Sequence, residues 1–185
     1  MKIRTITAGI TLSLEKKEPD VSFTALFLNK AKELFTSKGS EVQSIRLSTQ
    51  PWVKYLRKMD EKDIIDNICD LENLCIEKGV DFLSIGTIFN ADLIDIIPRI
   101  LKKTKVTSCS VTIGNKKNGI NFEAIKKTAQ AILEISRITD NGIGNFSFAG
   151  IVNCPPDIPF FPASYHKGKP VFSIGTESGD LVMNA

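Results

Sequence analysis

Apolar residues along the chain follow two periodicities, one typical of β-strands and one typical of amphipathic helices. Residues 3–12 and 42–50 form short, mostly apolar stretches, as strands do. Between them, residues 20–38 carry apolar side chains at every third or fourth position, which places these side chains on one face of a helix. We expect Asp20 to cap this helix and Gly39 to end it, because glycine readily adopts the left-handed conformation that follows many helices. The apolar positions of the helix are Val21, Ala25, Leu28, Ala31 and Phe35.

The same alternation of strand and helix then repeats. A second helix is predicted to begin at Asp60 and to end at Gly79. Residues 80–89 are almost continuously apolar, which is typical of a strand that is buried on both faces of a parallel sheet. A short helix is expected over residues 91–103, bent or interrupted at Pro98. The inward face of the second helix is predicted to carry Ile64, Ile68, Leu71 and Cys75.

Three further strands complete the pattern, over residues 106–113, 146–152 and 171–174. Asn121 is expected to cap a long helix between the first two of them. Strands that alternate with helices of ten residues or more imply crossover connections, so the sequence predicts one α/β domain over residues 1–185, with a mostly parallel sheet and helical crossovers. The inner face of the last helix is predicted to carry Phe122, Ile125, Ala129 and Ile132.

Composition narrows the class of protein. The 185 residues are 42% hydrophobic and 24% charged, a mixture typical of a folded globular domain. The net charge of +3 is small, and the lysine pairs are scattered rather than gathered into a basic patch with aromatics. We therefore expect no nucleic-acid partner.

The sequence also indicates the compartment. No segment reaches the roughly eighteen consecutive apolar residues that a membrane helix needs, and residues 1–7 alternate like a strand instead of forming a signal peptide. We expect a cytoplasmic protein without membrane association. The four cysteines do not form the close pairs of zinc or redox motifs, and we interpret them as reduced structural thiols.

Ligands of parallel sheets bind beyond the carboxyl ends of the strands, and three segments are predicted to lie there. The first runs from Gly114 to Asn121, between a strand and a helix. Its glycines allow a tight turn, its lysines supply positive charge, and the following helix presents the positive end of its dipole, so a small anionic metabolite would be stabilised there. A polar turn with a good helix cap would have the same composition. The candidate binding residues are Asn115, Lys116, Asn118, Gly119 and Asn121.

The second segment, residues 153–166, contains four prolines and the only histidine of the chain. His166 and Asp157 are candidate acid–base residues, because a rigid loop can hold such groups in position. Asn153 and Tyr165 are candidate ligand-binding residues. A lone histidine is also commonly a packed residue with its hydrogen bonds satisfied, and the sequence does not decide between these interpretations.

The third segment, residues 175–180, follows the last strand. Glu177 is a candidate catalytic carboxylate and Ser178 a candidate ligand-binding residue. A divalent metal, if one is bound, would take Asp157, His166 and Glu177 as its ligands. Two ordinary acids on a surface loop would give the same pattern.

Several motifs in order resemble one family of uncharacterised prokaryotic proteins, placed beside the pyruvate formate-lyase-like α/β barrels. The resemblance extends over most of the chain and is most specific in its last two motifs. The motifs are Ile3-Arg4-Thr5-Ile6-Thr7-Ala8-Gly9-Ile10, Ser110-Val111-Thr112-Ile113-Gly114 with Lys117-Asn118-Gly119-Ile120-Asn121, Asp157 to His166, and Ile174-Gly175 with Ser178-Gly179.

The resemblance implies one half of such a barrel and carries no known reaction. Glycyl radical chemistry is not expected, because the sequence has no Arg-Val-x-Gly-Tyr segment and no adjacent cysteines. Relatives of this family continue past the equivalent of Ala185. We therefore expect a homo-oligomer, or completion of the barrel by a missing C-terminal half.

Three functional hypotheses remain. The chain is an enzyme that acts on a small anionic or carbonyl-bearing metabolite, through acid–base or metal-assisted chemistry. Alternatively, it binds such a metabolite without turnover, as a regulatory module, or it serves as a structural subunit of a larger assembly. The position of His166, either open to a pocket or packed and satisfied, is the observation that separates the first two.

Overall fold

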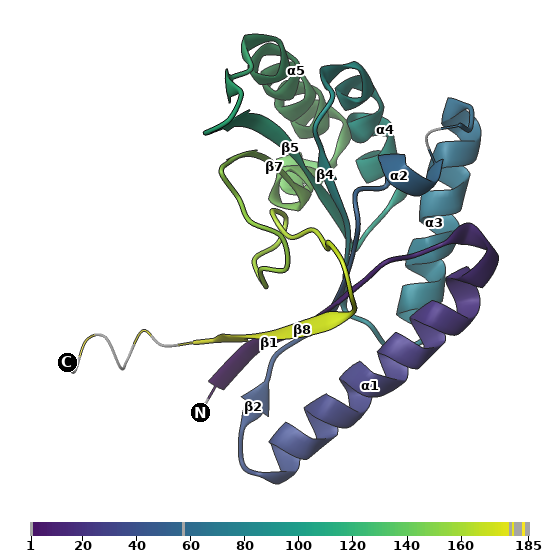
Figure 1. Ribbon diagram of the computed structural model, residues 1–185, viewed down its shortest axis with the longest axis vertical. Helices are drawn as coiled ribbons and strands as arrows, with labels where there is room; N and C mark the ends of the chain where they lie inside the picture. The colour runs from purple at the N-terminus through teal and green to yellow at the C-terminus, as the bar shows by residue number, and fades with distance from the viewer. Residues whose placement is uncertain (1, 57, 178, 180–182, 184–185) are drawn as a thin grey trace.

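The computed structural model describes residues 2–56, 58–177, 179 and 183 and shows a curled, mixed α/β sheet with helices on one side (Figure 1). The strands are β1 (Lys2–Ile10), β2 (Glu41–Val42), β3 (Ile45–Thr49), β4 (Phe82–Ile88), β5 (Thr107–Asn115), β6 (Gly119–Ile120), β7 (Phe148–Val152) and β8 (Val171–Thr176). The α-helices are α1 (Lys17–Ser37), α2 (Val53–Leu56), α3 (Glu61–Glu77), α4 (Ile97–Lys103) and α5 (Phe122–Ile138), and shorter 3-10 turns cover Leu14–Lys16, Ala91–Ile96 and Asp140–Ser147. In the described part of the chain, no helix is long and apolar enough to cross a membrane.

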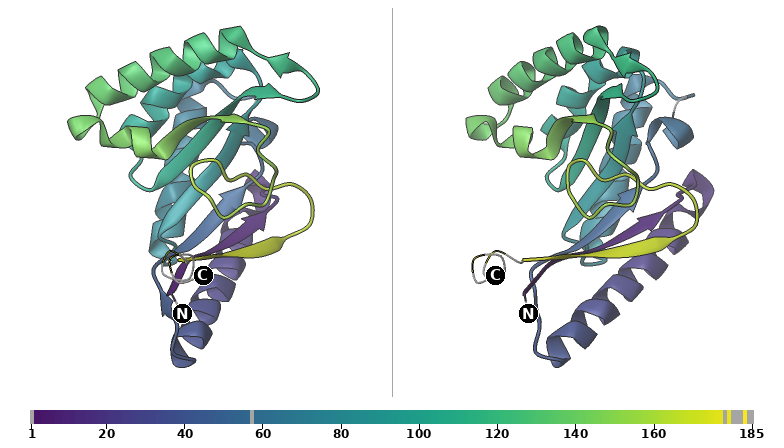
Figure 2. Two further views of the ribbon diagram at one scale, coloured as in Figure 1. Left: turned by 90° about the vertical axis from the view of Figure 1, so that its left-hand side faces the viewer. Right: turned by 60° about the vertical axis from the view of Figure 1, so that its left-hand side comes forward.

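The main strands are parallel, as the sequence predicts. β1, β3, β4, β5 and β7 pair in parallel in this spatial order, and the sheet curls into a half-barrel (Figure 2). β2 extends the β3 side of β1, and β6 forms a short antiparallel hairpin with the end of β5.

β8 is also antiparallel: it pairs with β1 at the edge of the sheet. The connection from β7 to β8 is a loop over residues 153–170 and contains no crossover helix. Parallel neighbours need a crossover, whereas a returning loop reverses the direction of the chain. The prediction that the end of β8 joins the carboxyl ends of the other strands is therefore wrong.

One face of the sheet, which we call the helix face, packs against α1, α3, α4 and α5 (Figure 1). It carries aliphatic side chains that are fully buried, such as Leu47 on β3 and Leu83 on β4. Burial of this apolar area is the main force that holds the helices on the sheet. The predicted inner residues of α3 are all buried, and Asp60 caps α3 by accepting a hydrogen bond from the Asp63 amide. Gly79 ends this helix region with a positive φ of 78°.

The inner face of α5 differs from the prediction. The residues that face the sheet are Ala124, Thr128, Ala131 and Ile135. The predicted residues Phe122, Ile125, Ala129 and Ile132 are exposed instead. Small side chains let α5 approach β7 closely: a Cβ on Gly150 would lie 3.4 Å from Cγ2 of Thr128. Large apolar residues predicted the wrong face because close packing selects for small ones here.

Three boundaries also shift. α1 begins at Lys17 after a 3-10 turn, so Asp20 lies inside the first turn and is not the cap. The strand expected over residues 42–50 is interrupted between β2 and β3. The strand expected from residue 146 begins at Phe148, because a 3-10 segment precedes it.

The opposite face, which we call the loop face, carries hydroxyl side chains and is covered by the loop of residues 153–170 (Figure 2). The loop is tied to the sheet by hydrogen bonds: Oγ of Ser84 donates to the carbonyl oxygen of Ser164 at 2.6 Å, and Oγ of Ser164 lies 3.0 Å from Oγ of Ser48. Nine hydroxyl residues share this face by strand register: Thr5, Thr7, Ser48, Ser84, Thr87, Ser108, Ser110, Thr112 and Ser173.

Candidate functional site at the carboxyl edge of the sheet

The turn after β5 is organised by asparagine side chains. Oδ1 of Asn115 accepts hydrogen bonds from the amides of Lys117 and Asn118 at 3.0 and 2.8 Å. Oδ1 of Asn121 accepts from the Ala124 amide at 3.0 Å and so caps α5, as the sequence predicts. Asparagine suits both places, because its short side chain reaches the backbone a few residues ahead.

Asn153 joins this turn to the end of β7. Its Oδ1 accepts from the Lys116 amide at 2.8 Å, across 37 positions of sequence. Asn153 has a positive φ of 51°, a conformation that asparagine tolerates better than most residues. Two of the three predicted segments therefore meet at one edge of the sheet.

A cavity of about 300 Å³ lies at this edge. It is of the size expected for a small-molecule site. The backbone of the turn and the first residue of α5 form its walls, and Phe89, which follows β4, adds an aromatic wall. The lining residues are Phe89, Thr112, Gly114, Asn115, Asn118, Gly119, Ile120, Asn121 and Phe122.

The amides of the turn are engaged within the protein, which differs from the expected cradle of free backbone N–H groups. Those of Lys116, Lys117 and Asn118 donate to asparagine side chains. Each of those side chains uses its carbonyl oxygen as the acceptor, so the amide NH₂ group remains as the donor. Asn121 likewise uses its carbonyl oxygen, on the Ala124 amide. The polar side-chain groups that remain for a ligand at the wall of the cavity are therefore the NH₂ groups of Asn115 and Asn121 and the side-chain amide of Asn118, whereas the Thr112 hydroxyl lies 3.3 Å from that of Thr87.

His166 belongs to the loop of residues 153–170 and packs against the sheet, with no exposed surface. Its Nδ1 lies 2.7 Å from Oδ1 of Asp157, and its Nε2 lies 3.1 Å from the carbonyl oxygen of Gly168. Both ring nitrogens therefore have a hydrogen-bond partner within the protein. Of the two interpretations of the lone histidine, the geometry matches the packed and satisfied one.

Gly9 on β1 provides the space for this pair. A Cβ on Gly9 would lie 2.6 Å from Nδ1 of His166 and 3.3 Å from Oδ1 of Asp157. The His166 amide also donates to the carbonyl oxygen of Thr49 at the end of β3. The pair therefore fixes the loop against the ends of two strands.

Tyr165 connects this loop to the cavity. Its ring packs edge-on against Phe89 with centroids 6.1 Å apart, and its hydroxyl donates to the carbonyl oxygen of Cys154. Burial raises the pKa of the Tyr165 hydroxyl, and Cys154 and Asp157 raise it further. The phenol therefore stays neutral near pH 7 and acts as a hydrogen-bond donor.

Glu177 lies away from these residues, at the amino edge of the parallel strands. Its amide donates to the carbonyl oxygen of Lys2, and its Oε2 accepts from Nε2 of Gln43 at 2.9 Å. The antiparallel direction of β8 places it there, so it does not join Asp157 and His166. Ser178 lies outside the described residues. Within the described ranges, no group of three or more His, Cys, Asp or Glu side chains is arranged to hold a metal ion.

Two features of this edge were not predicted from the sequence. Phe89 and Thr112 line the cavity but follow or end apolar strands, where they resembled core residues. The hydroxyl residues of the loop face were also missed, although they recur at every second position, as in Ser108, Ser110 and Thr112. That period of two could have predicted a hydroxyl-bearing face of the sheet, because alternate residues of a strand share one face.

Comparison with known proteins gives a consistent assignment. The family described as uncharacterised ACR (DUF711) matches residues 1–185. UPF0210 proteins of Methanosarcina mazei and Syntrophotalea carbinolica are 28% and 27% identical over the whole chain. A UPF0210 protein of Clostridium perfringens is 27% identical, also over the whole chain. The match covers 46% of each of these relatives, so the chain spans about half their length. Because the family match extends over all 185 residues, the chain belongs to the DUF711 family of uncharacterised proteins.

Proposed function

We propose that the cavity at the carboxyl edge binds a small metabolite with a carboxylate, phosphate or carbonyl oxygen. The carrying observation is that Asn115 and Asn121 each fix their carbonyl oxygen on backbone amides, which leaves NH₂ donors at the cavity wall. NH₂ donors that are held in place in this way favour a ligand that carries acceptor oxygens. Lys116 and Lys117 are exposed on the same turn and add positive charge.

Phe89 supports the proposal from the other wall of the cavity. An aromatic wall beside a few polar groups is typical of small-molecule sites, because the apolar surface adds affinity and the polar groups fix orientation. Tyr165 packs against Phe89, so the loop of residues 153–170 backs this wall.

The test is titration of the protein with inorganic phosphate, acetate and pyruvate, followed by NMR or calorimetry. Asn121→Asp is the informative variant, because aspartate retains the capping oxygen and replaces the NH₂ donors with a negative charge. We expect this variant to bind the same probes at least roughly tenfold more weakly while unfolding at a similar temperature. Asn67→Asp on α3 makes the same chemical change far from the cavity and serves as the control.

Two results would contradict the proposal. One is that none of the three probes binds to the wild-type protein. The other is that Asn121→Asp binds them as tightly as the wild type does.

Acid–base catalysis by His166 is the second candidate function. The 2.7 Å pair with Asp157 favours it, because a carboxylate commonly orients a catalytic imidazole. The buried ring would have to become accessible when the loop moves. If turnover of a metabolite is found, His166→Gln should reduce kcat by about a hundredfold or more. Unchanged turnover would leave His166 with a structural role only.

The relation to pyruvate formate-lyase-like barrels stays a proposal as well. The half-barrel of five parallel strands supports it, and a solved structure of a full-length relative would test it.

A further inference from the structure

Both lateral edges of the half-barrel are open among the described residues. β8 pairs with β1 on one side only, and β7 pairs only with β5. Each edge therefore presents a row of backbone N–H and C=O groups without a strand partner. Such edges are places where another strand can add.

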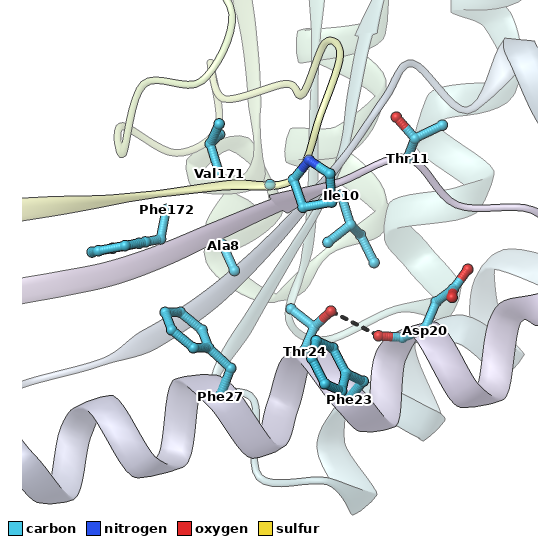
Figure 3. A pocket seen from close by; sticks show the side chains of 11 residues that line it. Ala8, Ile10, Thr11, Asp20, Phe23, Thr24, Phe27, Val171 and Phe172 are labelled. Carbon is cyan, nitrogen blue, oxygen red and sulfur yellow. Dashed lines mark hydrogen bonds between the residues drawn. The ribbon is translucent and has the colours of Figure 1, made fainter.

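An apolar groove runs beside the β8 edge, between β8 and α1 (Figure 3). Its volume is about 340 Å³. Phe27 of α1 and Phe172 of β8 approach each other across it, with ring centroids 5.4 Å apart. The other side chains that matter here are Ala8, Ile10, Asp20 and Phe23.

The apolar flank of α1 is the one that faces away from its neighbouring helix. Nδ2 of Asn29 donates to the carbonyl oxygen of Lys78 at the end of α3, which directs that flank of α1 toward α3. Phe23 and Phe27 lie on the other flank, toward β8 (Figure 3). Phe23 is 76% exposed.

The opposite edge has a matching arrangement. Nζ of Lys127 lies 3.0 Å from Oδ2 of Asp95, so this flank of α5 faces the 3-10 segment at Ala91–Ile96. The opposite flank carries an exposed apolar stripe beside the β7 edge. We define the stripe as Phe122, Ile125, Ile132 and Leu133.

Charged side chains of opposite sign accompany the two apolar surfaces. Asp20 lies in the groove, and its carboxylate makes no hydrogen bond or ion pair with the described residues. Lys126 lies one helical turn from Phe122 at the border of the stripe and is exposed, with no ion pair to the described residues. The groove and the stripe are therefore both apolar, and the charges beside them are opposite in sign.

We propose that the groove binds the α5 stripe of a second copy of this chain, with the β7 edge of that copy alongside β8. A two-fold axis repeats the contact at the other pair of edges and closes both sheets into one barrel. The groove beside β8 and the stripe beside β7 are different surfaces. In each contact the groove of one copy therefore binds the stripe of the other, and neither surface has to contact its own counterpart. This inference is independent of the proposed metabolite site.

Light scattering coupled to size-exclusion chromatography tests the proposal, with a dimer of twice 20.4 kDa as the expected species. Phe172→Glu in the groove and Leu133→Glu on the stripe should each raise the dissociation constant by about a hundredfold or more, because each buries a carboxylate in an apolar contact. Leu26→Glu is the matched control: Leu26, Phe172 and Leu133 are exposed by 54, 55 and 56%, but Leu26 lies outside both surfaces. A mixture of the two disruptive variants should recover some dimer, since one intact contact forms between them.

A charge exchange provides a second test that leaves the core unchanged. Asp20→Lys and Lys126→Asp should each weaken the dimer by several-fold, and the double variant should restore it. A wild-type monomer at all concentrations would overturn the proposal. So would a dimer that dissociates with Leu133→Glu but persists with Phe172→Glu, because α5 would then pack against α5.

Discussion

Leu83 and Ser84 are neighbours on β4 and both are fully buried, yet they face opposite sides of the sheet. Leu83 packs into the helix face among other aliphatic residues. Ser84 faces the loop side, and its hydroxyl holds the carbonyl oxygen of Ser164. Similar burial is thus achieved by two different interactions.

The two faces differ in what they require of the sequence. The helix face needs volume and apolar area, because its stability comes from removing apolar surface from water. The loop face needs small hydroxyl residues and a glycine, because a non-helical loop brings backbone polar groups that must find partners. A buried hydrogen bond contributes a net stability of about 1 kcal/mol, similar to one buried methylene group, but it also specifies one position for the loop.

The largest expected effect is on the helix face. Leu83→Ala should lower the free energy of unfolding by about 2–5 kcal/mol, because it removes apolar contacts and leaves a cavity. Chemical denaturation measures this loss. If Leu83→Ala lowers the free energy of unfolding by less than Ser84→Ala does, the proposed difference between the helix face and the loop face is wrong.

High pH should also lower the stability that comes from packing at the helix face. Burial raises the pKa of the Cys109 thiol to about 12, and burial with nearby Glu72 raises that of Cys75 to about 12, from an ordinary value of 9.0. A raised folded-state pKa means that the stability is complete below pH 9 and is lost as the pH rises toward 12. Between pH 9 and 12, each thiol should lower the free energy of unfolding by about 1.4 kcal/mol per pH unit.

The measurement for this prediction is the free energy of unfolding as a function of pH. The variant with both Cys75→Ala and Cys109→Ala is the control, since lysines and tyrosines titrate in the same range. Its slope between pH 9 and 12 should be shallower than that of the wild type. Equal slopes would show that the thiols make no contribution.

On the loop face, Gly9→Ala should destabilise the protein by about 1–3 kcal/mol, because the new methyl group overlaps the His166 ring. Hydrogen exchange should then show a less protected His166 amide, which donates to Thr49 in the wild type. If the clash is the cause, adding His166→Ala should cost less in the Gly9→Ala background than in the wild type. Strict additivity would point to another cause.

The smallest effect is expected for single hydroxyls. Ser84→Ala should cost about 1 kcal/mol, because it leaves the Ser164 carbonyl without its partner. Ser110 is equally buried, but its hydroxyl has no hydrogen-bond partner among the described residues. Ser110→Ala should therefore be neutral or slightly stabilising, and thermal unfolding of the two variants makes the comparison.

Much of the helix face was predictable from local sequence. The periodic apolar residues of α1 and α3 and the caps at Asp60 and Asn121 appear where the pattern places them. These features depend on side chains within a few positions of each other. α5 is the exception, because its packing depends on Gly150, which is distant in sequence.

The candidate site was predictable only in part. Asn115, Asn121 and Asn153 were among the expected binding residues, and the structure brings all three to one edge of the sheet. The hydrogen bonds from the amides of this turn to asparagine side chains were not predicted, because a sequence does not show which donor meets which acceptor. The separation of Glu177 from His166 follows from the direction of β8 alone.

By itself, the sequence determined the succession of strands and helices, the parallel pairing of the main strands and two of the three segments expected at their carboxyl ends. These follow from local periodicity and from the geometry of crossover connections. Only the tertiary structure decided the direction of β8, the packing of His166 against Gly9, the exposed flank of α5 and the open edges. The physical reason is that each of these depends on close contact between segments far apart in the chain, where a single methyl group changes which arrangement fits.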